Sequence, residues 1–212
     1  MTVTRLLIAR HGNTFGPGDT VTRLGKTDLP LVASGLEQGR ALGRYLAKEK
    51  LVPDAVFTSK LKRTIQTAEE TQKATGLPLS LQSLSIFDEI DYGVDENRPE
   101  TEVSARLGED AIKAWDQNAV VPPGWNIDPA AIMHNWKNFA GQIASDHKGK
   151  TVLVVTSNGI ARFSPCLTGN FKGFLATHKI KISTGALCVF ENRDGDKNWI
   201  CTGWNIKPGG SL

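Results

Sequence analysis

Three short apolar runs in this chain have the length and composition of buried β-strands. They are residues 4–9 (TRLLIA), residues 54–58 (DAVFT) and residues 151–156 (TVLVVT), and the last gives the strongest signal. Continuous apolar runs of about four to eight residues, rich in Val, Leu and Ile, are typical of strands that are covered on both faces. The pattern therefore predicts a central sheet buried between other elements.

The segments between these runs have the features of helices. One predicted helix opens at Ser34, because Ser34 and Glu37 have capping-box spacing. Another starts after Ser59, its predicted N-cap, and ends at Gly76. The predicted helices cover residues 34–48, 60–75, 102–118, 129–146 and 159–167.

The C-terminal part has the pattern of a β-hairpin. Residues 186–191 and 199–202 are β-prone and flank the turn-rich stretch NRDGDKN. A two-residue turn at 194–195 would place Cys188 opposite Cys201. In a reducing compartment, free buried thiols are favoured over a disulfide between these strands.

Strands that alternate with helices predict a parallel sheet with helices on both faces. With the C-terminal hairpin added, the expected fold class is α/β: a three-layer α/β/α sandwich whose mostly parallel sheet has an antiparallel edge hairpin. We expect one domain over residues 1–212, with the irregular residues 87–129 as an insertion on the substrate side.

Composition narrows the classes of function. The 212 residues include 25 basic and 22 acidic ones, for a net charge of +3, and no run of like charges indicates nucleic-acid binding. No apolar stretch approaches the roughly 20 residues that span a bilayer, and the N-terminus lacks the pattern of a secretory leader. We therefore expect a cytoplasmic protein with no membrane and no nucleic-acid partner.

Chemistry is indicated first at Arg10-His11-Gly12, which follows the first predicted strand directly. The carboxyl ends of parallel strands are where open α/β sheets bind ligands. Gly12 would let the backbone approach an anion, Arg10 offers a fork of donors for phosphate oxygens, and a neutral His11 can attack phosphorus. The alternative for this tripeptide alone is a core histidine beside a surface arginine.

Further motifs resemble the histidine phosphatase (phosphoglycerate mutase-like) superfamily, branch 1, over nearly the whole chain. They occur in the family's order: LLIARHGNT at 6–14, GKTDLPLVASGLEQGRALG at 25–43, FTSKLKRTIQTAEE at 57–70, FDEIDYG at 87–93 and VLVVTSNGIAR at 152–162. A series of motifs in order is far more specific than any one of them.

The resemblance implies a covalent phosphohistidine mechanism. His11 would be the nucleophile, and Arg10 and Arg63 would bind the phosphoryl oxygens. Glu89 would protonate the leaving group if a crowded, anionic pocket raises its pKa. From the residues alone, Arg63 is equally a solvated helix arginine. Asp88, Asp91 or a plain surface carboxylate cluster compete with Glu89.

One departure from the family pattern concerns a second histidine that members usually carry after the late strand. Ser157 stands at that place, and its hydroxyl can still hydrogen-bond a phosphate oxygen, as can the neighbouring Asn158. Asn158 is also a plausible N-cap for the following helix. His178 is the candidate that would replace the missing imidazole.

The expected function is hydrolysis of a small phosphorylated substrate, with no metal and no cofactor. The missing second histidine and the FGPGDT loop around Pro17 argue against a mutase, which remains a weaker alternative. A catalytically impaired phosphate-binding or regulatory homologue is the other alternative, because Ser157 supplies no positive charge. The sequence makes no prediction of the oligomeric state.

Overall fold

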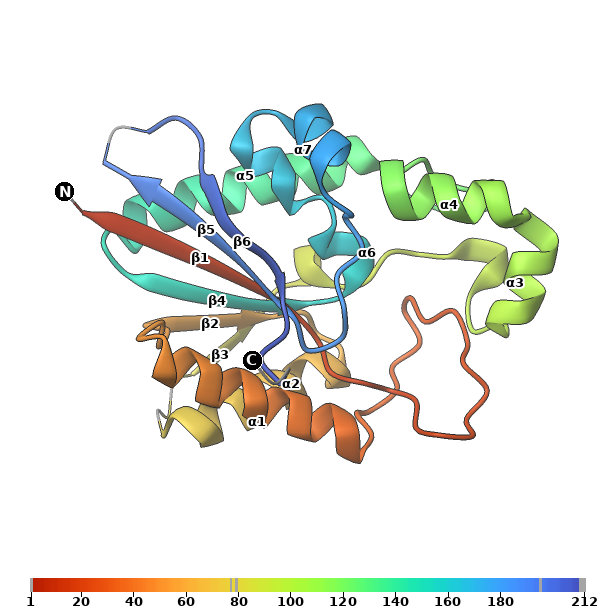
Figure 1. Cartoon of the computed structure of the whole chain (residues 1–212), viewed down its shortest axis with the longest axis horizontal. Helices are drawn as coiled ribbons and strands as arrows, with labels where there is room; N and C mark the ends of the chain where they lie inside the picture. The colour runs from red at the N-terminus through yellow and green to blue at the C-terminus, as the bar shows by residue number, and fades with distance from the viewer. Residues whose placement is uncertain (1, 77, 79, 195, 210–212) are drawn as a thin grey trace.

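The structure, a computed structural model, describes residues 2–76, 78, 80–194 and 196–209. Six strands form one sheet in the order β3-β2-β4-β1-β5-β6 (Figure 1). The neighbouring strands β3, β2, β4 and β1 are parallel, whereas β5 and β6 are antiparallel to their neighbours. The strands are β1 (Val3–Arg10), β2 (Ala55–Thr58), β3 (Leu81–Ser83), β4 (Thr151–Thr156), β5 (Leu187–Arg193) and β6 (Ile200–Ile206).

Helices cover both faces of the sheet, so the predicted three-layer α/β/α arrangement is confirmed. Figure 1 shows α1 (Ala33–Lys48) and α2 (Lys62–Thr75) below the sheet and α5 (Pro129–Asp146) above it. Alternate side chains of β4 enter different cores: Val152 and Val154 join one cluster, and Leu153 and Val155 join the other. The strand is apolar throughout because both of its faces are covered.

The segment predicted as an insertion, residues 87–129, contains two α-helices, where the sequence predicted one. α3 (Glu100–Leu107) ends and α4 (Glu109–Asn118) begins at Gly108, whose φ of 78° breaks the helix. The short predicted helix at 159–167 is also divided, into α6 (Asn158–Ala161) and the 3₁₀ turn η3 (Ser164–Thr168). The remaining elements are η1 (Ser85–Phe87), η2 (Gly93–Asp95) and α7 (Phe171–Thr177).

Both predicted serine caps are wrong. α1 starts one residue before Ser34, whose hydroxyl accepts from the side chain of Asn13 instead of capping the helix. α2 starts at Lys62, and Ser59 accepts from the N–H of Leu61 just outside it.

Carboxylates from other parts of the chain bind the free N–H groups around the start of α2. Asp28 accepts from the N–H of Lys62 and Asp88 from that of Lys60, each at 2.7 Å. Pairing partners that lie this far away along the chain have no local sequence signal.

The hairpin is confirmed, but its predicted register is wrong. Cys201 is paired with Phe190, and bulges shift the ladder between Val189 and its neighbours. Cys188 therefore does not lie opposite Cys201, and the cysteines are free thiols. Residue 195 of the predicted turn lies outside the described residues. In the described part of the chain, no helix is both long and apolar enough to cross a membrane.

Candidate active site

Arg10 and His11 lie at the carboxyl end of β1, as predicted. The N–H of His11 donates to the carbonyl of Thr156 at the end of β4, so the two strands end together. Gly12 also has a packing role that was not expected: a Cβ there would overlap the carbonyl oxygen of Gly35 in α1. The glycine is needed because α1 approaches the loop closely.

His11 is held with its nucleophilic nitrogen free. Its Nδ1 lies 2.7 Å from the carbonyl oxygen of Gly12. A carbonyl oxygen only accepts, so Nδ1 carries the hydrogen and Nε2 keeps a lone pair. The ring is buried, and burial, together with Arg63 and Arg10, lowers the pKa of His11 well below its usual value. The imidazole is therefore neutral at physiological pH.

Arg63 is not the solvated helix arginine of the alternative interpretation, because its side chain is completely buried. Two of its nitrogens donate to the carbonyls of Gly25 and Thr27, at 2.7 and 2.8 Å. Arg10 likewise donates to the carbonyl of Ile182 at 2.6 Å. The Nε–H groups of Arg10 and Arg63 are buried and have no partner among the described residues. Each guanidinium thus has one buried N–H group without an acceptor among the described residues. Such a group lowers the stability of the fold unless a ligand accepts a hydrogen bond from it.

Glu89 is distinguished from its two neighbouring carboxylates by burial. Asp88 binds the start of α2, and Asp91 forms an ion pair with Lys26 at 2.9 Å. Glu89 is 6% exposed and accepts from the N–H groups of Ile90 and Gly159, at 3.0 and 3.1 Å.

The pKa of Glu89 is raised, in the direction that a general acid needs, and only one of the two expected causes is present. Burial raises it, whereas the nearby cations Arg63 and Arg10 lower it. Crowding of the pocket was expected and acts through desolvation, whereas the expected neighbouring anions are replaced by cations.

Ser157 directly follows β4 and is completely buried, and its hydroxyl has no partner among the described residues. Asn158 is the first residue of α6 and not its N-cap. Its Oδ1 accepts from the N–H of Ile182 at 2.9 Å. This bond leaves the NH₂ group of Asn158 available as a donor.

His178, the predicted replacement for a second histidine, lies away from the cavity that contains His11. It is exposed, its ring stacks on Phe174 at 4.1 Å, and its Nδ1 is bonded to the hydroxyl of Thr177. It is not among the residues that line the cavity containing His11.

That cavity has a volume of about 520 Å³ and brings Arg10, His11, Glu89 and Asn158 together. Arg63 and Ser157 do not line it. Arg63 nevertheless lies near enough to influence the charge of both His11 and Glu89. In the described part of the chain, no cluster of three or more His, Cys, Asp or Glu side chains could hold a metal ion.

Sequence reasoning missed several residues of the cavity wall. They are Arg23, Tyr92, Glu100, Asp116, Arg162 and Lys181. Tyr92 and Arg162 stand inside the quoted motifs, so those motifs were the available signal. Arg23, Asp116 and Lys181 come from three separate loops and helices, and no local pattern connects them.

Comparison with known proteins gives a consistent assignment. The 2,3-bisphosphoglycerate-dependent phosphoglycerate mutase of Bifidobacterium longum (strain DJO10A) is 30% identical over 126 residues. The match covers 59% of this chain and 50% of the mutase, so the chain matches about half the length of such curated relatives.

Solved structures share the fold at low sequence identity. A mycobacterial glucosyl-3-phosphoglycerate phosphatase has a TM-score of 0.78 at 18% identity, covering 96% of this chain and 99% of its own. A putative alpha-ribazole-5'-P phosphatase from Escherichia coli K-12 has a TM-score of 0.71 at 22% identity, covering 99% of each chain. The model of the histidine phosphatase superfamily (branch 1) matches residues 6–207. This chain belongs to the histidine phosphatase superfamily, branch 1.

Proposed function

We propose that this protein hydrolyses a phosphomonoester through a phosphohistidine on His11. One observation carries the proposal: a neutral His11 lies near three buried donors that have no partner among the described residues. These donors are the Nε–H groups of Arg10 and Arg63 and the hydroxyl of Ser157. Unpartnered buried donors are destabilising unless a ligand binds them. A phosphoryl group on His11 would accept from Arg10 in the cavity wall, and from Arg63 and Ser157 after a small movement of the wall that separates them from the cavity.

In the first step, Nε2 of His11 attacks phosphorus and the bond from phosphorus to the ester oxygen breaks. Protonated Glu89 gives its proton to that oxygen, and the alcohol leaves. Guanidinium N–H groups of Arg10 and Arg63 stabilise the charge on the equatorial oxygens. In the second step, Glu89 takes a proton from water, which attacks the phosphohistidine. Inorganic phosphate and neutral His11 are released.

Ser157 is the feature that favours hydrolysis over the exchange of a phosphoryl group between substrates. A mutase must hold its phosphorylated intermediate and deliver the phosphoryl group again, and a neutral serine binds that group less strongly than an imidazolium does. The relatives named above include both a mutase and phosphatases. Their names alone leave the choice between these reactions to experiment.

The proposal is tested with His11→Asn, using His134→Asn on the exposed face of α5 as the matched control. With p-nitrophenyl phosphate in EDTA, we expect His11→Asn to lower kcat by at least about 10³-fold and His134→Asn to leave it unchanged. An acid-labile, alkali-stable phosphoenzyme should form on the wild type and on His134→Asn, and should be absent from His11→Asn. Equal turnover by His11→Asn would reject His11 as the nucleophile.

A second candidate function is phosphate binding without efficient turnover, and Ser157 is the observation that favours it. Ser157→Ala and Ser157→His separate the candidates, with Ser164→Ala as the control, because Ser164 is equally buried and unpartnered among the described residues. A working site should lose about tenfold or more in kcat/KM in Ser157→Ala, and should not gain from histidine. A large gain in Ser157→His would favour the impaired site.

A further inference from the structure

The cavity extends beyond the residues that would hold the phosphoryl group, and its wall there carries excess positive charge. Lys181 and Arg162 share the single carboxylate of Asp116, at 2.8 and 3.5 Å. One carboxylate neutralises only one of these two cations. Positive charge therefore remains on this part of the wall.

Arg162 is fixed and cannot turn away from the cavity. Only 1% of its side chain is exposed, and it donates to the carbonyl of Trp115 at 2.7 Å. Its guanidinium carbon lies 4.0 Å from the centre of the Trp115 ring. Lys181 has a side chain that is 60% exposed, so it can leave Asp116 at little cost.

The cavity wall also includes Arg23, which has a donor without a partner among the described residues. Its NH2 group is paired with Glu100 at 2.6 Å, and its guanidinium lies over the rings of Tyr92 and Trp125 at 5.3 and 5.1 Å. Its Nε–H is buried and has no partner among the described residues. The Arg23 side chain is only 14% exposed, so bulk water is a poor substitute for the missing acceptor.

We infer that the organic part of the substrate carries a second acidic group, bound by Lys181, Arg162 and Arg23. This inference rests on the proposed function and deepens it by naming the substrate class: a phosphomonoester with an additional anionic group. A second anion would match the uncompensated charge beside Asp116 and use the free N–H of Arg23. A ligand with a neutral organic part would leave both unmatched.

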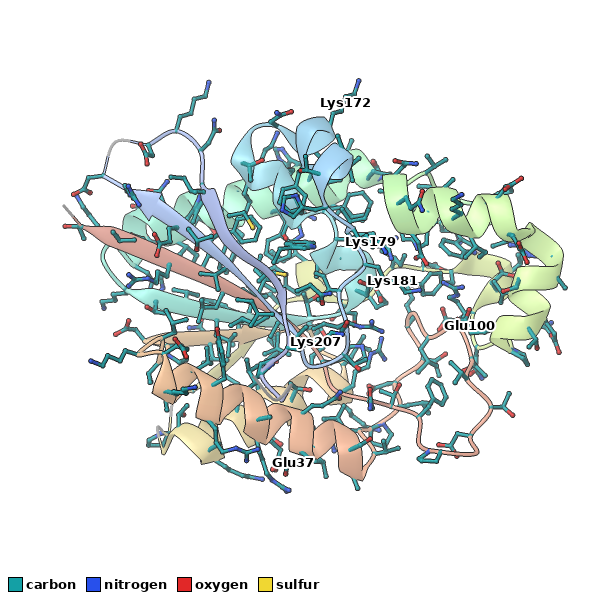
Figure 2. All side chains as sticks on the ribbon, in the orientation of Figure 1. Glu37, Glu100, Lys172, Lys179, Lys181 and Lys207 are labelled. Atoms are coloured by element: carbon teal, nitrogen blue, oxygen red, sulfur yellow. The ribbon has the colours of Figure 1, made fainter. Side chains whose placement is uncertain are left out.

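The test uses ligands that cannot be hydrolysed, so that it does not depend on turnover. Calorimetry measures the Kd of ω-carboxyalkylphosphonates with two, three or four methylene groups, and of the alkylphosphonates of the same length. The variants are Lys181→Met and, as a matched control, Lys179→Met. Lys179 is exposed on the same loop, nearer α7, and does not line the cavity (Figure 2).

For at least one chain length, we expect the carboxylate to tighten binding about tenfold in the wild type. Lys181→Met should remove most of this preference, and Lys179→Met should retain it. The inference is overturned if the carboxylate gives no preference at any length, or if Lys181→Met keeps the full preference. If alkylphosphonates bind but the carboxylate gives no preference, the second acidic group is rejected and the proposed hydrolysis is not. If neither series binds, both the second acidic group and the proposed function are rejected.

Discussion

At the scale of single residues, the site combines groups whose burial is unfavourable without a ligand. The completely buried Ser157 and Arg63 both keep donors without a partner among the described residues. Glu89 is also buried beside backbone N–H groups, in surroundings that penalise its charged form. Such arrangements are rare in protein cores and are concentrated at functional sites.

Glu89 leads to a prediction on pH dependence. Burial raises its pKa, so the protonated acid persists to higher pH than in an ordinary glutamate, and activity should fall as pH rises through that raised pKa. The pKa of His11 is lowered, so its neutral form is lost only at pH well below 6.5. The profile of kcat/KM should therefore be limited on its alkaline side by Glu89, with its acid limb at unusually low pH.

Glu89→Gln checks the assignment, since glutamine cannot donate a proton to the leaving group. With an alkyl phosphate such as glycerol 2-phosphate, kcat/KM, which reports the first step, should fall about 10²–10⁴-fold and its alkaline limb should disappear. The loss should be smaller with p-nitrophenyl phosphate, because its leaving group needs little protonation. An equal loss on both esters would contradict the role of Glu89 as the acid.

At the scale of elements, loops that join distant segments position the site. The carbonyls of Gly25 and Thr27 hold Arg63, and the N–H groups of the same two residues both donate to Glu96 Oε1, at 3.1 and 2.8 Å. Glu96 directly follows η2. The segment around η2 therefore holds the loop of Gly25 and Thr27, and this loop holds Arg63. The position of the Arg63 guanidinium depends on this chain of contacts.

Asp95, in η2, ties three parts of the insertion together. It is 2% exposed and accepts from Arg106 of α3 and, at 2.7 Å, from the indole N–H of Trp125. Asp95→Asn replaces an acceptor-only group with one that also donates, and should lower the free energy of unfolding by about 2–3 kcal/mol. For a chain of this size, Tm should fall by about 5–10 °C.

Thermal unfolding of Asp95→Asn is compared with that of Asp110→Asn, an exposed site on α4. Arg106 and Trp125 lower the pKa of Asp95, so its stabilisation is present above the unfolded value near 3.8 and is lost as pH falls below it. The difference from wild type should therefore shrink in acid. A constant difference, or one matched by Asp110→Asn, would contradict this account of Asp95.

At the scale of the whole molecule, the sheet places the ends of β1 and β4 side by side, and the flanking segments bring Arg63 and Glu89 to them. The cavity wall that extends the site is built from the loop before α1, the helix α4 and the loop before β5, which surround the carboxyl ends of the strands (Figure 1). This is the general location of ligand sites in α/β folds, where loops vary without disturbing the sheet.

The sequence by itself determined the layers and the central residues of the site. Residues 152–155 are all apolar because the sheet is covered on both faces, and the place of His11 directly after a predicted strand puts it at the carboxyl end of that strand. Only the tertiary structure decided the caps of α2, the register of Cys201, the free donors of Ser157 and Arg23, and the charge around Asp116. These features depend on desolvation and on pairing between residues far apart in the chain, and neither has a signature in local sequence.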